Sequence, residues 1–209
     1  MCGIFGYIGP KNNAAQLVFE GLKRLEYRGY DSWGVAVVPT TGKHIEVKKK
    51  IGKIAHANIS ELSPGTLSIG HTRWATHGGV TDVNAHPHLD CTKNIAIIHN
   101  GIFENFEEYK KLLIKKGHTF TSETDSEVIA HCIEDHLSTM PFQEAVRTTF
   151  LEMKGLNAII AIHKNERKLV AARQGSPLVI GFGKNENYLA SDPAALLPHT
   201  SSVYFLEDG

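Results

Sequence analysis

The stretch NIAIIHN, residues 94–100, limits the possible folds more than any other part of this chain. Side chains alternate along a strand, so Ile95 and Ile97 point to one face while Ala96 and Ile98 point to the other. A strand that is apolar on both faces must be covered on both faces. Short apolar, β-branched runs recur at residues 3–8, 35–38, 67–71, 158–162, 169–172, 178–180 and 203–206. These runs predict buried β-sheets.

Amphipathic helical patterns lie between these strands, at residues 14–25, 104–116, 125–137 and 141–153. Thr124 and Glu127 have the spacing of a capping box, and Asp192 precedes a short helical turn. Several helices follow one another without an intervening strand, which disfavours a regular doubly wound sheet. We therefore predict an α+β fold in which two packed sheets are flanked by helices.

Composition excludes several classes of protein. The chain has 209 residues, which suits one domain, and its 22 basic residues balance 22 acidic ones. The charge therefore favours neither nucleic acid nor an anionic membrane as a partner, and the lysines at residues 48–50 are interpreted as a solvated strand end. No signal peptide or membrane-spanning run is recognisable, and three cysteines without close pairs suggest a reducing compartment. We expect a cytoplasmic protein.

Metal-binding motifs are not visible in the sequence. The chain contains 12 histidines, but neither C-x-x-C nor H-E-x-x-H occurs. His131 and His136 lie five residues apart and therefore do not share one face of a helix. No glycine-rich phosphate-binding motif occurs either. We expect no metal and no cofactor.

Cys2 stands directly behind Met1 at the start of an apolar, glycine-spaced stretch, MCGIFGYIG. Removal of Met1 would give Cys2 a free α-amino group beside its thiol. Ordinary pKa values are about 8.5 for a thiol and about 8 for an α-amino group, so the amine could accept the thiol proton near neutral pH. The alternative is that Cys2 is a small buried apolar residue.

Two further segments are more polar than the strands that lead into them. Arg73, in HTRWATHGG, could hold a carboxylate through its planar guanidinium, or could form a structural ion pair. Trp74, Thr76 and His77 in the same short loop favour a ligand site. In HNGIFEN, the Asn100 amide and the Gly101 N–H could form an oxyanion hole, although Asn-Gly is also a strong hairpin-turn signal.

Asp125 falls in the first turn of a helix that starts within SETDSEV. It could compensate the helix dipole, or it could bind a substrate ammonium group. A thiol, an oxyanion hole, a carboxylate-binding arginine and an ammonium-binding aspartate together match an α-amino acid with a side-chain acyl group. Glutamine is the obvious candidate.

Eight segments carry a resemblance to a known family: MCGI, RLEYRGYDS, HTRWATHG, NAHPH, HNGIFEN, SETDSEVIAH, GSPLVIG and ASDPAALLP. They resemble the N-terminal glutaminase domain of the glucosamine-6-phosphate synthases, also called glutamine–fructose-6-phosphate aminotransferases (isomerizing). These belong to the class II, or N-terminal-nucleophile, glutamine amidotransferases. The resemblance spans residues 1–209 and implies a four-layer α-β-β-α sandwich of the N-terminal-nucleophile hydrolase type.

The resemblance also implies roles for individual residues. Cys2 would be the nucleophile with its own amine as base, and Asn100 with Gly101 would form the oxyanion hole. Arg73 would hold the glutamine carboxylate, and Asp125 with the Gly101 carbonyl would hold its amino group.

Four further residues receive supporting roles from the same resemblance. Thr76 and His77 would complete the pocket, Trp74 would gate the route of ammonia, and Arg28 would support the N-terminus.

The expected function is hydrolysis of glutamine to glutamate and ammonia through a thioester on Cys2. In the full enzyme, which is expected to be a homo-oligomer, sugar isomerase domains absent from this chain would pass the ammonia to fructose 6-phosphate. The product, glucosamine 6-phosphate, would feed UDP-N-acetylglucosamine synthesis. Two alternatives remain open: another class II amidotransferase with a different acceptor, and a non-catalytic glutamine-sensing module.

Overall fold

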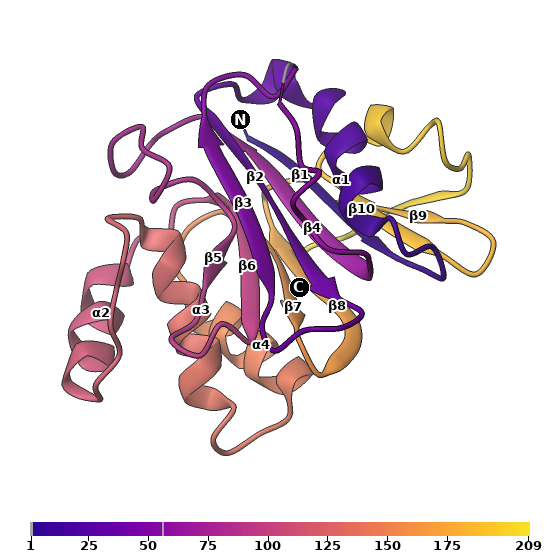
Figure 1. The fold of residues 1–209 in the computed structure, drawn as a ribbon. Helices are drawn as coiled ribbons and strands as arrows, with labels where there is room; N and C mark the ends of the chain where they lie inside the picture. Colours follow the sequence, from indigo (N-terminus) through magenta and orange to yellow (C-terminus); the bar gives the residue numbers. More distant parts are fainter. Residues whose placement is uncertain (1, 56) are drawn as a thin grey trace.

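The computed structural model describes residues 2–55 and 57–209. Met1 and His56 lie outside the described residues, and so does the predicted removal of Met1. The described chain forms two antiparallel sheets packed face to face, with helices on both outer surfaces (Figure 1).

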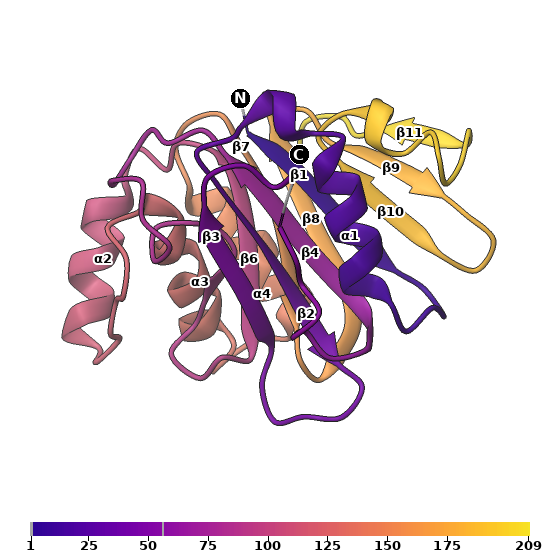
Figure 2. The same ribbon diagram turned by 45° about the horizontal axis from the view of Figure 1, so that its top comes forward.

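The larger sheet contains the N-terminal strand near its middle. From one edge to the other, its strands are β11 (Val203–Phe205), β9 (Val179–Phe182), β10 (Asn187–Ala190), β1 (Gly3–Ile8), β4 (Gly65–Arg73), β2 (Ser32–Pro39) and β3 (Glu46–Ile51). Figure 2 shows the C-terminal strands extending this sheet beyond α1 (Ala14–Lys23). Because β1 has a paired strand on each side, its backbone is fixed from Gly3 onward.

The smaller sheet consists of β5 (His88–Leu89), β6 (Ile95–Gly101), β7 (Asn157–His163) and β8 (Glu166–Gln174), in that order. Apolar side chains of both sheets interdigitate between them, among them Ile4, Ile69, Ile98 and Ile160. Ile95 and Ile97, in contrast, face the helices on the other side of the smaller sheet. The predicted two-faced burial of residues 94–100 is therefore confirmed.

Helices cover the outer face of each sheet. Helix α1 packs on the larger sheet, where Val18 and Leu22 contact the same core as Phe5. Two helices, α3 (Asp125–His136) and α4 (Phe142–Glu152), cover the smaller sheet, and α2 (Phe106–Lys115) packs against α3. Two single 3₁₀ turns, η1 (Glu26–Arg28) and η2 (Pro193–Ala195), complete the structure. This order of layers is the predicted α-β-β-α sandwich.

Two strands, β5 and β10, were not predicted from the sequence, and of a third, β3, only the lysine-rich end was predicted. Strand β3 contains the lysines at residues 48–50 and lies at the edge of the larger sheet, so it lacks the apolar alternation of a buried strand. Strands β5 and β10 contain no β-branched residue, so neither has the apolar, β-branched run by which the other strands were recognised. Helix α2 begins at Phe106 rather than Glu104, and α1 ends at Lys23 rather than Leu25.

None of the helices within residues 2–55 and 57–209 has the length and apolar character needed to cross a membrane.

Candidate active site

A cavity of about 360 Å³ opens where strands of both sheets end. Strand β1 runs antiparallel to β4, with Gly3 opposite Thr72, so the start of β1 lies beside the end of β4. The cavity brings together all the site residues predicted from the sequence: Cys2, Arg28, Arg73, Trp74, Thr76, His77, Asn100, Gly101 and Asp125. These residues come from five separate segments, so their convergence is a property of the tertiary structure.

Cys2 precedes β1 and lies against the loop that follows β4. The backbone N–H of Trp74 donates a hydrogen bond to Cys2 Sγ at 3.1 Å. Burial raises the pKa of the Cys2 thiol, against the opposing effects of the Trp74 N–H and the Arg73 charge. The thiol therefore needs a proton acceptor before it can act as a nucleophile near neutral pH.

Arg28 anchors the residue that carries this thiol. Its Nε donates to the Cys2 carbonyl oxygen at 3.2 Å, and its Nη1 pairs with Asp192 Oδ2 at 3.3 Å. Asp192 also caps η2, where its side chain accepts from the Ala194 N–H. Arg28 thus connects the Cys2 carbonyl to Asp192, and Asp192 is held in place by the turn η2 that it caps. These contacts agree with the predicted support of the N-terminus by Arg28.

The Asn100 amide points at Cys2 in a defined orientation. His71 Nε2 lies 3.0 Å from the Asn100 Oδ1 and 3.0 Å from the His99 carbonyl oxygen, two groups that only accept. The proton of His71 is therefore on Nε2. Asn100 Nδ2 is left to donate toward the Cys2 carbonyl oxygen, at 3.0 Å.

His71 keeps this orientation because it stays neutral. Burial lowers the pKa of His71 to about 3. No role was predicted for His71, although it lies in the motif HTRWATHG. The feature that could have indicated a role is its position as a polar residue in the buried strand β4.

Gly101 ends strand β6 with a positive φ of 129°. A Cβ at this position would lie 2.1 Å from the Leu156 carbonyl oxygen, so only glycine fits. Strand β6 continues to Gly101, pairs there with Asn157 of β7, and leads into α2. The alternative interpretation of Asn-Gly as a hairpin turn is therefore wrong.

Asp125 is buried in the first turn of α3. The predicted cap of this helix is confirmed, since Thr124 Oγ1 accepts from the Glu127 N–H at 3.2 Å. Asp125 Oδ2 accepts from the Phe103 N–H at 2.8 Å, which ties α3 to the segment after Gly101. The carboxylate also lines the cavity, where it could receive a cationic group.

Arg73 ends β4 and organises the loop that follows it. Its guanidinium donates to the carbonyl oxygens of Gly79 at 3.1 Å and Gly78 at 3.3 Å, and also to that of His77. Trp74 is 49% exposed at the mouth of this loop, with its ring 5.7 Å from that of Tyr30. Arg73 therefore shapes the wall of the cavity as well as contributing positive charge to it.

The cavity wall also contains residues that sequence reasoning did not select. His86 and the pair Ser176–Pro177 belong to the quoted motifs NAHPH and GSPLVIG, but no role was predicted for them. His99 hydrogen-bonds to Ser126 Oγ and Asn157 Oδ1, both at 2.8 Å, and so links β6 to α3 and β7. Such links depend on contacts between distant segments and leave no local sequence pattern.

Comparison with known proteins gives a consistent result. Residues 71–198 match the model of a glutamine amidotransferase domain. Over the whole chain, the sequence is 52% identical to a glutamine–fructose-6-phosphate aminotransferase [isomerizing] of Pyrococcus horikoshii and 50% identical to that of Thermus thermophilus. The chain spans only 35% and 34% of the length of these two relatives.

Two solved structures share the fold over the whole chain. One, titled the allosteric regulatory enzyme of purine biosynthesis, has a TM-score of 0.85 at 28% identity. The other, glutamine phosphoribosylpyrophosphate amidotransferase from B. subtilis in complex with ADP and GMP, has a TM-score of 0.82 at 26% identity. The chain covers 46% of each.

Proposed function

Because the chain belongs to the glutamine amidotransferase domain family, we propose that it hydrolyses L-glutamine to glutamate and ammonia through a γ-glutamyl thioester on Cys2. The observation that carries this proposal is the meeting of Cys2 and the Asn100 amide in one cavity, where Asn100 Nδ2 lies 3.0 Å from the Cys2 carbonyl oxygen. A thiol and a fixed amide donor in one cavity are what thioester chemistry requires.

The proposed reaction has two stages. The Cys2 α-amine, freed by removal of Met1, accepts the thiol proton, and the thiolate sulfur attacks the side-chain carbonyl carbon of glutamine. The negative charge that develops on the oxygen is stabilised by Asn100 Nδ2 and the Gly101 N–H. The C–N bond then breaks, and the amine returns its proton to the leaving ammonia. Water, deprotonated by the same amine, hydrolyses the thioester to glutamate and restores the thiol.

The remaining wall residues bind the substrate in this proposal. Arg73 pairs with the α-carboxylate of glutamine, and Asp125 with the Gly101 carbonyl holds the α-ammonium group. Thr76 and His77 complete the pocket, and Trp74 gates the exit of ammonia. The cavity volume of about 360 Å³ is adequate for an amino acid of this size.

We further propose that the chain is the glutaminase domain of a larger enzyme that makes glucosamine 6-phosphate for UDP-N-acetylglucosamine synthesis. Sugar isomerase domains outside residues 1–209 would bind fructose 6-phosphate and receive the ammonia, in a cytoplasmic homo-oligomer. The support is sequence identity: the chain is 52% identical to a glutamine–fructose-6-phosphate aminotransferase [isomerizing] but only 28% and 26% identical to the two solved structures. A different ammonia acceptor is the competing proposal.

A glutaminase assay with the purified chain tests the central proposal. We expect the wild type to release glutamate and ammonia in equal amounts and Cys2→Ala to release neither. An unchanged circular dichroism spectrum would show that this variant is folded. A chain that binds glutamine without releasing glutamate would instead be a sensing module. With fructose 6-phosphate added, the chain should form no glucosamine 6-phosphate.

Intact-mass measurement of the same preparations tests the proposed base. Activity should follow the fraction of chains that begin at Cys2, because an amide nitrogen behind Met1 has no basic lone pair. Full turnover by chains that retain Met1 would require another group as the base.

A further inference from the structure

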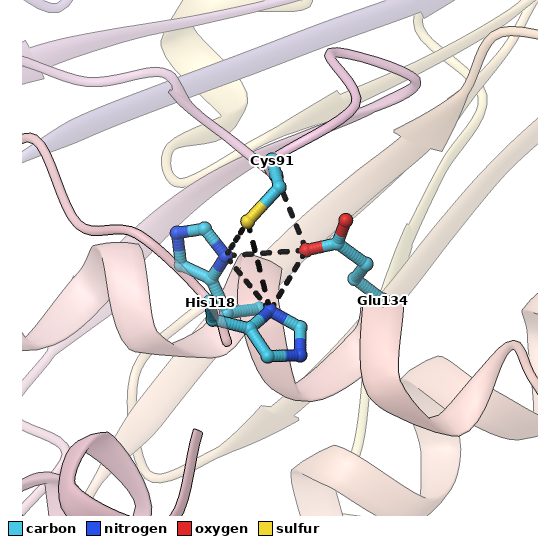
Figure 3. Close-up of side chains that lie close together, drawn as sticks. Cys91, His118 and Glu134 are labelled. Atoms are coloured by element: carbon cyan, nitrogen blue, oxygen red, sulfur yellow. Dashed lines mark hydrogen bonds and ion pairs between the residues drawn. The ribbon is translucent and has the colours of Figure 1, made fainter. Parts of the chain in front are cut away.

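A second group of chemically active side chains lies outside the active-site cavity. Figure 3 shows Cys91, His118 and Glu134 pointing toward one another, and His131 completes the group. We call these four residues the Cys91 cluster. Cys91 follows β5, His118 follows α2, and the other two residues lie on α3.

One donor atom from each member faces a common point. The Cys91 sulfur lies 3.7 Å from His118 Nδ1 and 3.5 Å from His131 Nδ1, and the two Nδ1 atoms are 3.4 Å apart. Glu134 Oε2 lies 3.0 Å from His118 Nδ1 and 3.2 Å from His131 Nδ1. All four atoms lie within 4.8 Å of one another.

The five separations that involve an imidazole nitrogen, 3.0 to 3.7 Å, are close to those of a tetrahedron around a metal ion. Zinc binds nitrogen and oxygen at about 2.0 Å and thiolate sulfur at about 2.3 Å, which places tetrahedral ligand atoms roughly 3.3 to 3.5 Å apart. Hydrogen bonding alone does not account for the arrangement, because each imidazole Nδ1 carries at most one proton yet has three close neighbours.

We propose that the Cys91 cluster is a structural zinc site. The donor set of one sulfur, two nitrogens and one oxygen suits zinc and not magnesium or calcium, which take oxygen ligands. A thiolate and a carboxylate supply two negative charges that balance Zn²⁺ in a partly buried place. Four protein ligands close the coordination shell, which is typical of a structural and not of a catalytic zinc.

The surroundings of both imidazoles support this assignment. In metal sites the ring nitrogen that does not bind the metal faces a carboxylate or a carbonyl. His131 Nε2 lies 3.8 Å from Glu127 Oε1, and His118 Nε2 lies 4.0 Å from Asp135 Oδ1. Within the described residues, His131 Nε2 is buried without a hydrogen-bond partner, and the Glu127 carboxylate lies close enough to orient the ring once a metal is bound.

The site is accessible from outside the protein. Cys91 is exposed, while His131 is buried, and both line a surface groove of about 610 Å³. A zinc ion bound there would join the turn after β5 and the segment after α2 to α3. That helix carries Asp125 in its first turn, so the ion would stabilise an element of the active-site wall.

No local sequence pattern marks this site, and the expectation of no metal rested on local spacing. The ligands come from three separate segments: His118 lies 27 positions after Cys91, and Glu134 lies three positions after His131. None of the usual zinc motifs has this pattern.

Metal content and cobalt spectroscopy test the proposal on the full chain. After purification without chelators, we expect about one zinc per chain by elemental analysis, as for a closed four-ligand site. Replacement by Co²⁺ should give tetrahedral d–d bands in the visible spectrum and a thiolate-to-cobalt charge-transfer band in the near ultraviolet. Zinc should also raise the midpoint of thermal unfolding.

Variants separate the proposed ligands from their neighbours. Cys91→Ser should abolish the charge-transfer band, lower zinc affinity at least ~100-fold and remove the thermal effect of zinc, because it deletes the only thiolate of the cluster. Since Cys91 is exposed in a turn, we expect this variant to fold, and circular dichroism checks it. His118→Gln should likewise lose zinc, whereas His136→Gln, one turn further along α3, should retain it. The band should persist in Cys2→Ala.

Three results would overturn the proposal. The first is a wild-type chain without zinc that also fails to take up Co²⁺. The second is metal binding that survives both Cys91→Ser and His118→Gln, which would mark an adventitious ion only. The third is a charge-transfer band that disappears in Cys2→Ala, which would place the metal on the active-site thiol.

Discussion

At the scale of single residues, the active site depends on one hydrogen-bonded chain. His71 Nε2 donates to Asn100 Oδ1, and Asn100 Nδ2 donates toward Cys2. Because His71 is buried with a pKa lowered to about 3, it remains a neutral donor across the physiological range. The orientation of the Asn100 amide beside Cys2 is therefore fixed without a ligand, which is the condition for effective electrostatic catalysis in the proposed reaction.

Replacing Asn100 with Ala should lower kcat for glutamine hydrolysis by about 10²- to 10³-fold and leave KM nearly unchanged, as expected for loss of one oxyanion donor. Steady-state kinetics with product analysis checks this. His71→Ala, which leaves Asn100 in place without its partner, should give a smaller loss in kcat. A change confined to KM in Asn100→Ala would assign the amide to substrate binding instead.

Arg73 offers a second test at this scale. Arg73→Lys keeps the positive charge but loses the planar, multidentate guanidinium that contacts the loop carbonyls. We expect KM for glutamine to rise about tenfold or more, with a smaller effect on kcat. The lysine would weaken the proposed binding of the substrate carboxylate and would lose the hydrogen bonds that shape the loop. Lys23→Arg serves as a control, because it makes the reverse substitution in helix α1, outside the lining of the cavity. Unchanged kinetics in Arg73→Lys would exclude a direct role for the guanidinium.

At the scale of elements, helix α3 connects three features of the molecule. Its N-cap Thr124 fixes the first turn, Asp125 faces the cavity, and the two following turns carry residues of the Cys91 cluster. The helix packs against β6 and α4 through a buried apolar face that includes Ile129 and Ile133. Small changes at its N-terminus should therefore affect stability and substrate binding together.

Thr124→Ala should lower the free energy of unfolding by about 1 kcal/mol, within the range of roughly 0.5 to 2 kcal/mol for loss of an N-cap. It should also raise KM for glutamine, because Asp125 loses the turn that positions it. Denaturant unfolding and kinetics on one preparation measure both effects. Thr124→Ser keeps a hydroxyl acceptor for the Glu127 N–H and should behave like the wild type. Equal losses in both variants would show that the methyl group matters and the cap does not.

At the scale of the whole molecule, burial at one end of the sandwich suppresses the charge of several histidines. Burial lowers the pKa of His71 to about 3, lowers that of His86 well below its usual range, and lowers that of His99. In the unfolded chain these groups regain ordinary pKa values of about 6.5. Below that pH the unfolded state binds protons that the native state does not, so acid favours unfolding.

The free energy of unfolding should therefore fall as the pH decreases from about 7.5 to 5.5, with each such histidine contributing up to about 1.4 kcal/mol per pH unit below its unfolded pKa. Denaturant unfolding at a series of pH values measures the slope. His86→Gln should make the slope shallower, whereas His44→Gln, at an exposed position, should not. Stability that stays constant over this range would show that these histidines are protonated in the native state.

The sequence by itself determined the layered fold and indicated most of the residues proposed for the active site. Alternation at residues 94–100 required two covered faces, the capping pattern at Thr124 placed α3, and polar residues at strand ends marked Arg73 and Asn100. These features are local: strand alternation, helix capping and turn chemistry act within a few residues, so they can be recognised in one dimension. The family resemblance added roles to positions that this reasoning had already selected and contributed one further position, Arg28.

Only the tertiary structure decided which distant groups meet. Three contacts join segments that are 26 or more residues apart: His71 with Asn100, Arg28 with the Cys2 carbonyl, and Cys91 with the other members of its cluster. Strand β3 likewise exists because β2 offers it a hydrogen-bonding edge, and not because its charged sequence favours it. Such contacts follow from sheet order and helix packing, which bring together side chains whose spacing in the sequence has no period to recognise.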